Sequence, residues 1–293
     1  MSVSPSDMAQ PPRSLSGAGP DGRPPQVLLI GAGKMGGAMA RGWLARGLPP
    51  ENLAVVDPSL PALQNGVTSF PSADALFLCL GSSVPDVVVV AIKPQLFASL
   101  LPAYAPLAKA GALFFSVAAG QTLSGMQDLL GGSARLVRAM PNTPASVGWG
   151  MTVMVAGDGV QLQDRTLCSA LANAIGDTAW VEDEALMDAV TAISGSGPAY
   201  VFQLTESLTQ GAEALGLPKD LAALLARRTV IGAGVLMDRD PSPASTLREN
   251  VTSPGGTTAA ALEVLRAEPV GMTDLVTKAV TAARDRSQAL AKP

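Results

Sequence analysis

Three glycines near the start of the sequence have the spacing of a phosphate-binding loop. Gly31, Gly33 and Gly36 form a GxGxxG pattern between an apolar run at residues 26–30 and a helical pattern at residues 38–47. In such a loop the first glycine permits a tight turn, the second lets the backbone approach a pyrophosphate, and the third lets the helix pack closely on the strand. The N–H groups at the start of the helix are available to phosphate oxygens. The pattern predicts dinucleotide binding, although a glycine-rich loop of another α/β protein has the same local sequence.

An acidic residue follows the next predicted strand, at the position that contacts the ribose in many dinucleotide-binding proteins. Asp57 ends the apolar run at residues 53–56 and lies 21 residues after Gly36. A carboxylate there binds the ribose hydroxyls and repels a 2′-phosphate, so this residue favours NADH over NADPH. The alternative is a turn-forming aspartate, because Pro58 follows it directly.

A lysine closes the apolar, β-branched run at residues 87–92, which has the composition of a strand buried on both faces. The carboxyl ends of parallel strands face the ligand crevice of an open α/β sheet. Lys93 is therefore expected near the nicotinamide end of a bound dinucleotide. An exposed lysine before the turn at Pro94 is the alternative reading of the same residues.

A second glycine-rich loop precedes a short helical pattern at residues 259–266. Gly255 and Gly256 are followed by Thr257 and Thr258, which exposes backbone N–H groups and hydroxyls at the start of a helix. Such a helix N-terminus is a natural pocket for a small carboxylate. An ordinary helix cap fits the local sequence as well.

The composition excludes several classes of function. The 293 residues contain no histidine, so a Ser-His-Asp triad, a histidine general acid and histidine metal sites are ruled out. Cys79 and Cys168 form no CxxC pair, which predicts neither a metal site nor a disulfide framework and suits a reducing, cytoplasmic compartment. The net charge of −4 and the scarcity of aromatic residues argue against a nucleic-acid partner. No apolar run has the length of a membrane span.

The chain is expected to form an α/β protein with two domains after a tail. Residues 1–25 are rich in Pro, Ser and Gly and are expected to be a disordered tail. Residues 26–181 alternate between strand and helix patterns, which predicts a parallel sheet with right-handed crossovers. Residues 182–293 have apolar residues at helical spacing and form the predicted all-helical domain. Its helices are apolar most of the way round, which indicates a subunit interface.

Several short segments together resemble the pyrroline-5-carboxylate reductase family. They are AIKPQ at residues 91–95, SVAAG at 116–120, MPNTP at 140–144, SGSGPAY at 194–200 and VTSPGGTT at 251–258. The resemblance extends from about residue 26 to about residue 290. It implies an N-terminal Rossmann-like domain and a C-terminal helical domain that builds a homodimer, which in this family often assembles further into a ring of dimers.

The resemblance also assigns roles to individual residues. Ser253 and the backbone around Gly256, Thr257 and Thr258 are expected to hold the substrate carboxylate, with Thr258, the predicted catalytic residue, beside the ring nitrogen. Together with the glycine pattern and Asp57, the predicted cofactor-binding residues are Ile30, Gly31, Ala32, Gly33, Lys34, Met35, Gly36, Asp57, Ala91, Ile92, Lys93 and Pro94. The family usually favours NADPH, whereas Asp57 favours NADH, so the sequence leaves the coenzyme as NADPH or NADH.

The implied reaction suits a protein without histidine. Hydride transfer from NAD(P)H to the C=N bond of 1-pyrroline-5-carboxylate gives L-proline, the last step of proline biosynthesis. A substrate bound as the iminium needs no proton in that step, whereas a neutral imine needs a relay through Thr258 or water. Two alternatives remain. One is another nicotinamide-dependent reductase of similar architecture, such as one acting on a 3-hydroxy acid. Such enzymes commonly use a lysine of the helical domain, and this reading is disfavoured because Lys219, the only lysine between residues 182 and 277, lies at a predicted helix start. The other is a non-catalytic dinucleotide-sensing protein.

Overall fold

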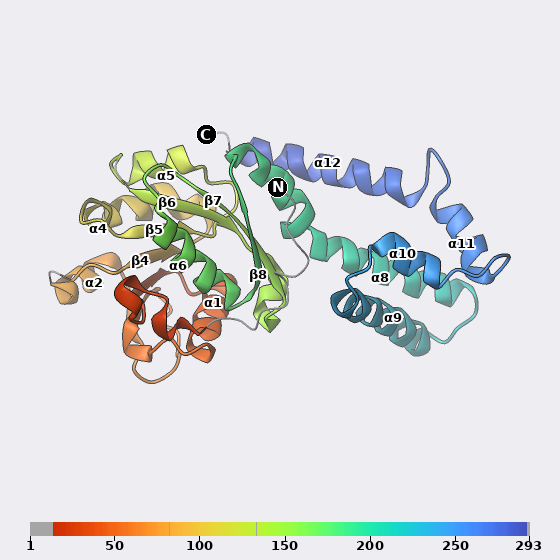
Figure 1. The fold of residues 1–293 in the computed structure, drawn as a ribbon, viewed down its shortest axis with the longest axis horizontal. Coiled ribbons are helices and arrows are strands. Elements are labelled where there is room, and N and C mark those ends of the chain that lie inside the picture. Colours follow the sequence, from red (N-terminus) through yellow and green to blue (C-terminus); the bar gives the residue numbers. More distant parts are fainter. Residues whose placement is uncertain (1–13, 82, 133, 292–293) are drawn as a thin grey trace. The chain divides into compact units, whose positions relative to one another are not determined.

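The structure, a computed structural model, describes residues 14–81, 83–132 and 134–291. This part of the chain folds into two compact units (Figure 1). Residues 14–195 and 284–291 form a unit built around a sheet, called the sheet unit below. Residues 196–283 form the helical unit.

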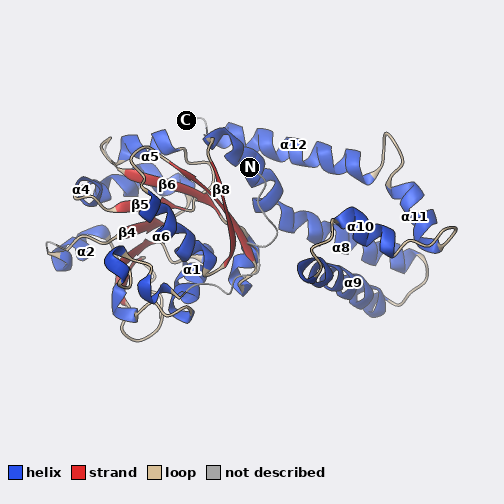
Figure 2. Ribbon diagram, viewed as in Figure 1, coloured by secondary structure: helices blue, strands red, loops and turns tan. Residues whose placement is uncertain are grey.

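The sheet has eight strands in the order β3-β2-β1-β4-β5-β6-β7-β8 (Figure 2, red). The strands are β1 (Val27–Ile30), β2 (Leu53–Val56), β3 (Thr68–Phe70), β4 (Val87–Val90), β5 (Leu113–Ser116), β6 (Arg135–Met140), β7 (Gly150–Ala156) and β8 (Gly176–Val181). The pairs from β3 through β6 are parallel, as the sequence predicts. The sheet is nevertheless mixed, because β7 runs antiparallel to β6 and pairs in parallel with β8.

The strand order reverses next to β1. The chain goes from β1 outward to β2 and β3 and then returns to the other side of β1 with β4. Val27 of β1 is paired with Leu53 of β2 and with Val87 of β4, so β1 is central and buried. The carboxyl ends of β1 and β4 therefore lie side by side at a topological switch point, where ligands bind in open α/β sheets.

Helices cover both faces of the sheet. Alternate residues of β1 point to opposite faces: Leu29 belongs to the core that α1 and α6 cover, and Leu28 to the core that α2 to α5 cover. The helices of this unit are α1 (Lys34–Ala45), α2 (Ala73–Leu80), α3 (Phe97–Leu100), α4 (Ala105–Lys109), α5 (Leu123–Leu129), α6 (Leu162–Asn173) and α7 (Met187–Val190). The three layers are those of a Rossmann-like domain.

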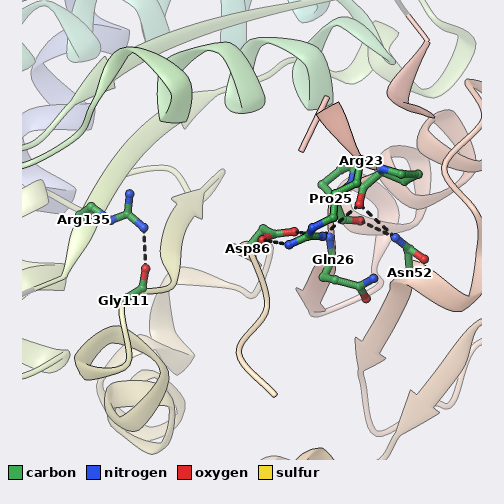
Figure 3. A network of polar contacts seen from close by, with 8 residues as sticks. Arg23, Pro25, Gln26, Asn52, Asp86, Gly111 and Arg135 are labelled. Atoms are coloured by element: carbon green, nitrogen blue, oxygen red, sulfur yellow. Dashed lines mark hydrogen bonds and ion pairs between the residues drawn. The ribbon is translucent and has the colours of Figure 1, made fainter. Parts of the chain in front are cut away.

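The segment from residue 14 to residue 25 is folded, which corrects the predicted disordered tail; residues 1–13 lie outside the described residues. We call residues 14–25 the strap. Leu15 is fully buried in the core around Trp43, and its backbone N–H donates to the carbonyl of Arg46 at 3.0 Å. Arg23 forms two hydrogen bonds with Asp86, at 2.7 and 2.8 Å, ahead of β4 (Figure 3). A single buried leucine forms no periodic pattern. The Pro- and Gly-rich sequence of this segment therefore gives no sign that Leu15 belongs to the core.

The helical unit contains the helices α8 (Gly197–Ala214), α9 (Lys219–Arg239), α10 (Ala244–Asn250), α11 (Thr257–Leu265) and most of α12 (Met272–Ala291). Gly216, at φ +92°, and Pro218 form the turn between α8 and α9, which pack against each other. Within residues 196–283 only Ala222, Ala226 and Gly271 are buried.

The division between the units comes later than the predicted boundary after residue 181. The 3-10 turn Glu184–Leu186, α7 and a π-helical turn at Thr191–Gly195 all belong to the sheet unit. Met187 explains this, because it is fully buried against Val153 and Val155 of β7. The end of α12 also returns to the sheet unit, from residue 284 onward.

Candidate active site

The glycine-rich loop joins β1 to α1 at the switch point. Gly31 has φ +88°, and its N–H donates to the carbonyl of Val56 at 2.8 Å. A Cβ atom at Gly31 would lie 2.8 Å from the carbonyl oxygen of Ala91, so the close approach of this loop to the end of β4 requires glycine. A Cβ at Gly36 would overlap the carbonyl oxygen of Gly31. Both glycines are therefore explained by packing within the protein.

Gly33 is glycine for a different reason. It is the N-cap of α1, and a Cβ atom at this position would meet no other atom of the protein within 4 Å. The first N–H groups of an α-helix have no partner inside the helix. Space above Gly33 and N–H groups at the start of α1 are the features that a pyrophosphate needs. The residues present thus fit a dinucleotide.

The loop after β4 lies beside the glycine-rich loop. The N–H of Ala91 donates to the carbonyl of Ile30 at 2.8 Å, and the Ile92 side chain is close to Gly31. Lys93 is exposed and precedes the 3-10 turn Pro94–Leu96. The structure therefore brings the two predicted groups of cofactor-binding residues together.

Asp57 follows β2 and turns back toward the same loop. One carboxylate oxygen accepts the N–H of Ala32 at 2.7 Å. The other accepts the N–H and the hydroxyl of Ser59, at 2.8 and 2.6 Å. Partial burial acts to raise the pKa of Asp57, but these hydrogen bonds outweigh it and lower the pKa below the ordinary 3.8. The carboxylate is ionised at neutral pH. Because two carboxylate oxygens offer about four acceptor positions, it can still accept a ribose hydroxyl.

The structure joins two further segments whose contact the sequence did not reveal. The Asn142 side chain follows β6 and donates to the Ser194 hydroxyl at 3.3 Å, and its oxygen accepts the N–H of Met151 at 2.9 Å. It thereby connects the ends of β6 and β7 with the π-helical turn. The available signal was that Asn142 and Ser194 belong to two of the family segments, MPNTP and SGSGPAY, but the two residues lie 52 positions apart.

An ion pair that the sequence also missed holds the start of α5 and the 3-10 turn Glu184–Leu186 to the sheet. Arg138 of β6 is 4% exposed and donates to Glu184 at 2.8 Å. The same carboxylate oxygen accepts the N–H of Leu123 at 2.8 Å. Nothing in the local sequence marks an arginine inside a strand as buried, because its partner comes from a distant turn.

The threonine-rich loop starts α11 in the helical unit. Gly255 has φ +70°, Gly256 is the N-cap of α11, and the N–H of Gly256 donates to the carbonyl of Ser253 at 3.0 Å. A Cβ atom at Gly256 would lie 2.7 Å from the Ser253 hydroxyl, so that hydroxyl lies beside the helix N-terminus. Thr257 and Thr258 are the first residues of the helix. Hydroxyls and helix N–H groups at one point can bind a small carboxylate.

The predicted residues thus form two groups, each within its own unit. The cofactor-binding residues surround the switch point of the sheet unit, and the substrate-binding residues surround the start of α11. In the described part of the chain, no three Cys, Asp or Glu side chains are grouped as metal ligands would be. Among the described helices, none has the length and apolarity needed to cross a bilayer.

Comparisons with known proteins match both units. The family model for pyrroline-5-carboxylate reductase dimerisation matches residues 184–290. A family model described as NADP oxidoreductase, coenzyme F420-dependent, matches residues 26–120. A pyrroline-5-carboxylate reductase of Glycine max is 38% identical over 268 residues, covering 89% of this chain and 94% of the relative. One of Pseudomonas aeruginosa is 36% identical, covering 92% of this chain and 97% of the relative.

Solved structures agree with the sequence comparisons. A pyrroline-5-carboxylate reductase from Coxiella burnetii has a TM-score of 0.82 and 33% identity, covering 92% of this chain and 99% of that chain. A pyrroline carboxylate reductase of Plasmodium falciparum was solved with NADP bound. It has a TM-score of 0.75 and 30% identity, and the match covers 92% of this chain and 98% of that chain.

Proposed function

Because the chain belongs to the pyrroline-5-carboxylate reductase family, we propose that it reduces the C=N bond of 1-pyrroline-5-carboxylate with NADPH or NADH to give L-proline. This is the last step of proline biosynthesis. The observation that supports the substrate most directly is the loop before α11, where a hydroxyl and the N-terminus of a helix meet.

The coenzyme is held at the switch point of the sheet. The N–H groups at the start of α1 bind the pyrophosphate above Gly33, and Asp57 accepts a hydroxyl of the adenosine ribose. Lys93 and its neighbours border the nicotinamide end. When bound, the reduced nicotinamide supplies the hydride. This placement of the coenzyme is supported by the open space at Gly33 and by the contact between the glycine-rich loop and the loop after β4.

The substrate carboxylate binds at the start of α11. Ser253 contributes its hydroxyl, and Gly256, Thr257 and Thr258 contribute backbone N–H groups, with the positive end of the helix dipole favouring the anion. The hydroxyl of Thr258 accepts or donates a hydrogen bond at the ring nitrogen and orients the ring. For a substrate bound as the iminium, this orientation is the main task of the protein. For a neutral imine, Thr258 or a water also passes a proton to the nitrogen.

The protein assembles as a homodimer through its helical unit, in keeping with the match to the dimerisation model over residues 184–290. A ring of such dimers stays a prediction. A reducing, cytoplasmic compartment is the setting we infer, because Cys79 is exposed and Cys168 is buried, and neither forms a disulfide.

The test is a spectrophotometric assay of NADPH and NADH oxidation with 1-pyrroline-5-carboxylate. We expect proline as the product and turnover with at least one coenzyme. Turnover only with a 3-hydroxy acid in the oxidative direction points to a different reductase. Coenzyme binding without turnover of either substrate points to a sensing protein, and both results contradict the proposal.

A further inference from the structure

Two exposed cationic side chains lie on one face of α1. Lys34 and Arg41 are seven residues apart, which places them on the same side of the helix, two turns from one another. The helix contains no acidic residue, and the segment 57–67 after β2 contains only Asp57. Within the described part of the chain, the Arg41 side chain makes no ion pair and no hydrogen bond. Its positive charge is thus available to an anionic ligand.

The guanidinium group of Arg41 is turned back toward the glycine-rich loop. A Cβ atom at Gly37 would lie 3.3 Å from Nη1 of Arg41 and 3.2 Å from the carbonyl oxygen of Ala32. The space of one methyl group, which Gly37 leaves free, therefore separates the guanidinium from Ala32. Ala32 is also the residue whose N–H donates to the Asp57 carboxylate at 2.7 Å. Arg41 thus lies close to the residue that Asp57 contacts.

The segment after β2 approaches Arg41 from the other side. The N–H of Leu60 donates to the carbonyl of Asp57 at 3.0 Å, and Leu60 has φ +45°, so the chain turns directly after Asp57. An open hollow of about 390 Å³ lies between this segment and α1, lined by Arg41, Leu44, Ala45, Ala62, Leu63 and Gln64. Arg41 is the only charged residue among them, and it faces the segment that begins with Asp57.

We propose that Arg41 binds the 2′-phosphate of NADPH and offsets the repulsion that Asp57 exerts on it. The inference rests on the proposed function, because it takes the coenzyme to bind at the start of α1. In dinucleotide-binding proteins a carboxylate after the second strand binds the ribose hydroxyls, and a nearby arginine accommodates a 2′-phosphate. A planar guanidinium binds phosphate through two parallel N–H bonds, which an ammonium cannot reproduce. Arg41 and Asp57 act in opposite directions on this phosphate, so the ratio of the two coenzyme affinities reports on each.

The test measures the affinity of the full-length protein for NADPH, NADH, 2′,5′-ADP and 5′-ADP by titration calorimetry. Arg41→Gln should weaken the binding of NADPH and 2′,5′-ADP at least about tenfold, the loss expected for charge-assisted hydrogen bonds to phosphate. The affinities for NADH and 5′-ADP should stay nearly unchanged, which also shows that the variant is folded. Arg41→Lys, which keeps the charge but not the planar fork, should restore part of the loss. Added salt should weaken NADPH binding more in the wild type than in Arg41→Gln.

The matched control is Arg46→Gln, which removes the same type of side chain at the other end of α1 and should change none of the four affinities. An unchanged NADPH affinity in Arg41→Gln, or an equal loss for NADPH and NADH, overturns the proposal. So does a selective loss of NADPH binding in Lys34→Gln but not in Arg41→Gln, because Lys34 then holds the phosphate. The two ADP compounds lack the nicotinamide, so these titrations decide the role of Arg41 even if the protein fails to reduce 1-pyrroline-5-carboxylate. That failure contradicts the proposed function alone.

Discussion

Gly33 and Gly36 belong to one loop, but the structure gives them different reasons to be glycine. A side chain at Gly36 collides with the Gly31 carbonyl, whereas a side chain at Gly33 meets no protein atom. Packing within the protein therefore explains Gly36, whereas Gly33 leaves open space at the start of α1, which a bound pyrophosphate would need.

We expect Gly33→Ala to weaken coenzyme binding without weakening the fold. The added methyl group enters the space that the pyrophosphate needs. The affinity for the coenzyme should fall at least about tenfold, and the Tm of the free protein should stay within about 1–2 °C of wild type. Gly36→Ala is the matched control, for which the Tm falls. Titration and thermal unfolding of both variants check this, and an unchanged coenzyme Kd in Gly33→Ala contradicts it.

Thr258→Ala should lower kcat/KM for 1-pyrroline-5-carboxylate and leave stability almost unchanged. The variant loses one hydrogen bond to the substrate, which corresponds to about 1–3 kcal/mol of transition-state stabilisation. Ser245→Ala, an exposed hydroxyl on α10, is the control. Steady-state kinetics and chemical denaturation together make the measurement. Wild-type kinetics in Thr258→Ala count against any role for this hydroxyl.

Asp57 should set the coenzyme preference. The carboxylate is ionised at neutral pH because hydrogen bonds from Ser59 and Ala32 lower its pKa despite partial burial. We therefore expect it to repel the 2′-phosphate of NADPH at the pH of the assay. Asp57→Ser should shift the ratio of kcat/KM values toward NADPH by about fivefold or more, from about 1 kcal/mol of repulsion between solvated charges. Equal ratios in both proteins indicate that Asp57 does not reach the ribose.

At the scale of elements, the strap shows that a segment outside both matched family models belongs to the fold. Those models match residues 26–120 and 184–290, and the strap comes before them. Its backbone is held by the Asn52 side chain, which donates to the carbonyls of Pro24 and Pro25 at 3.2 and 3.3 Å (Figure 3). Asp86 accepts both the Arg23 guanidinium and the N–H of Gln26, at 2.7–2.8 Å. The strap thus joins β1, β4 and the loop before β2.

Leu15→Ala should destabilise the protein by about 2–4 kcal/mol, the usual cost of emptying a fully buried leucine site. Leu162→Ala is the control, because Leu162 is 80% exposed and its truncation should change the free energy of unfolding by less than about 0.5 kcal/mol. Urea denaturation measures both. If the two variants prove equally stable, the strap does not belong to the cooperative core.

At the scale of the whole molecule, the helical unit exposes more apolar surface than a stable monomer normally does. Phe202, Leu224, Ile231 and Met237 are 47–64% exposed, and only Ala222, Ala226 and Gly271 are buried between residues 196 and 283. Many exposed apolar side chains on one helical unit are typical of an obligate interface, which buries about 2,000 Å² or more. This agrees with the match of the unit to a dimerisation model.

The stability of the protein should therefore depend on its concentration. Dilution should lower the apparent Tm, and the monomer should be inactive, because we expect the helical unit to unfold without its partner. Leu224→Glu should prevent assembly, whereas Leu78→Glu, on a leucine of α2 that is 88% exposed, should not. Light scattering and activity measured on the same dilutions provide the check. A folded, active monomer contradicts an obligate dimer.

The sequence by itself determined the features that depend on local patterns. The β-branched run of β4, the glycines around β1 and the helical periodicity of α8, α9 and α12 are all encoded by neighbouring residues. The coenzyme loop was predictable for this reason, and so was the loop before α11, because a glycine pair, threonines and a helix start occupy adjacent positions.

Only the tertiary structure decided the features that depend on contacts between distant residues. Four features require partners far apart in the chain: the reversal of β7, the burial of Leu15, the hydrogen bond between Asn142 and Ser194, and the hydrogen bond between Ser287 and Asp188. The residues around a serine on an exposed helix do not reveal whether its hydroxyl bonds to water or to a carboxylate. Which of the two it meets is fixed by packing, since burying an unpaired polar group is costly and burying a paired one is not.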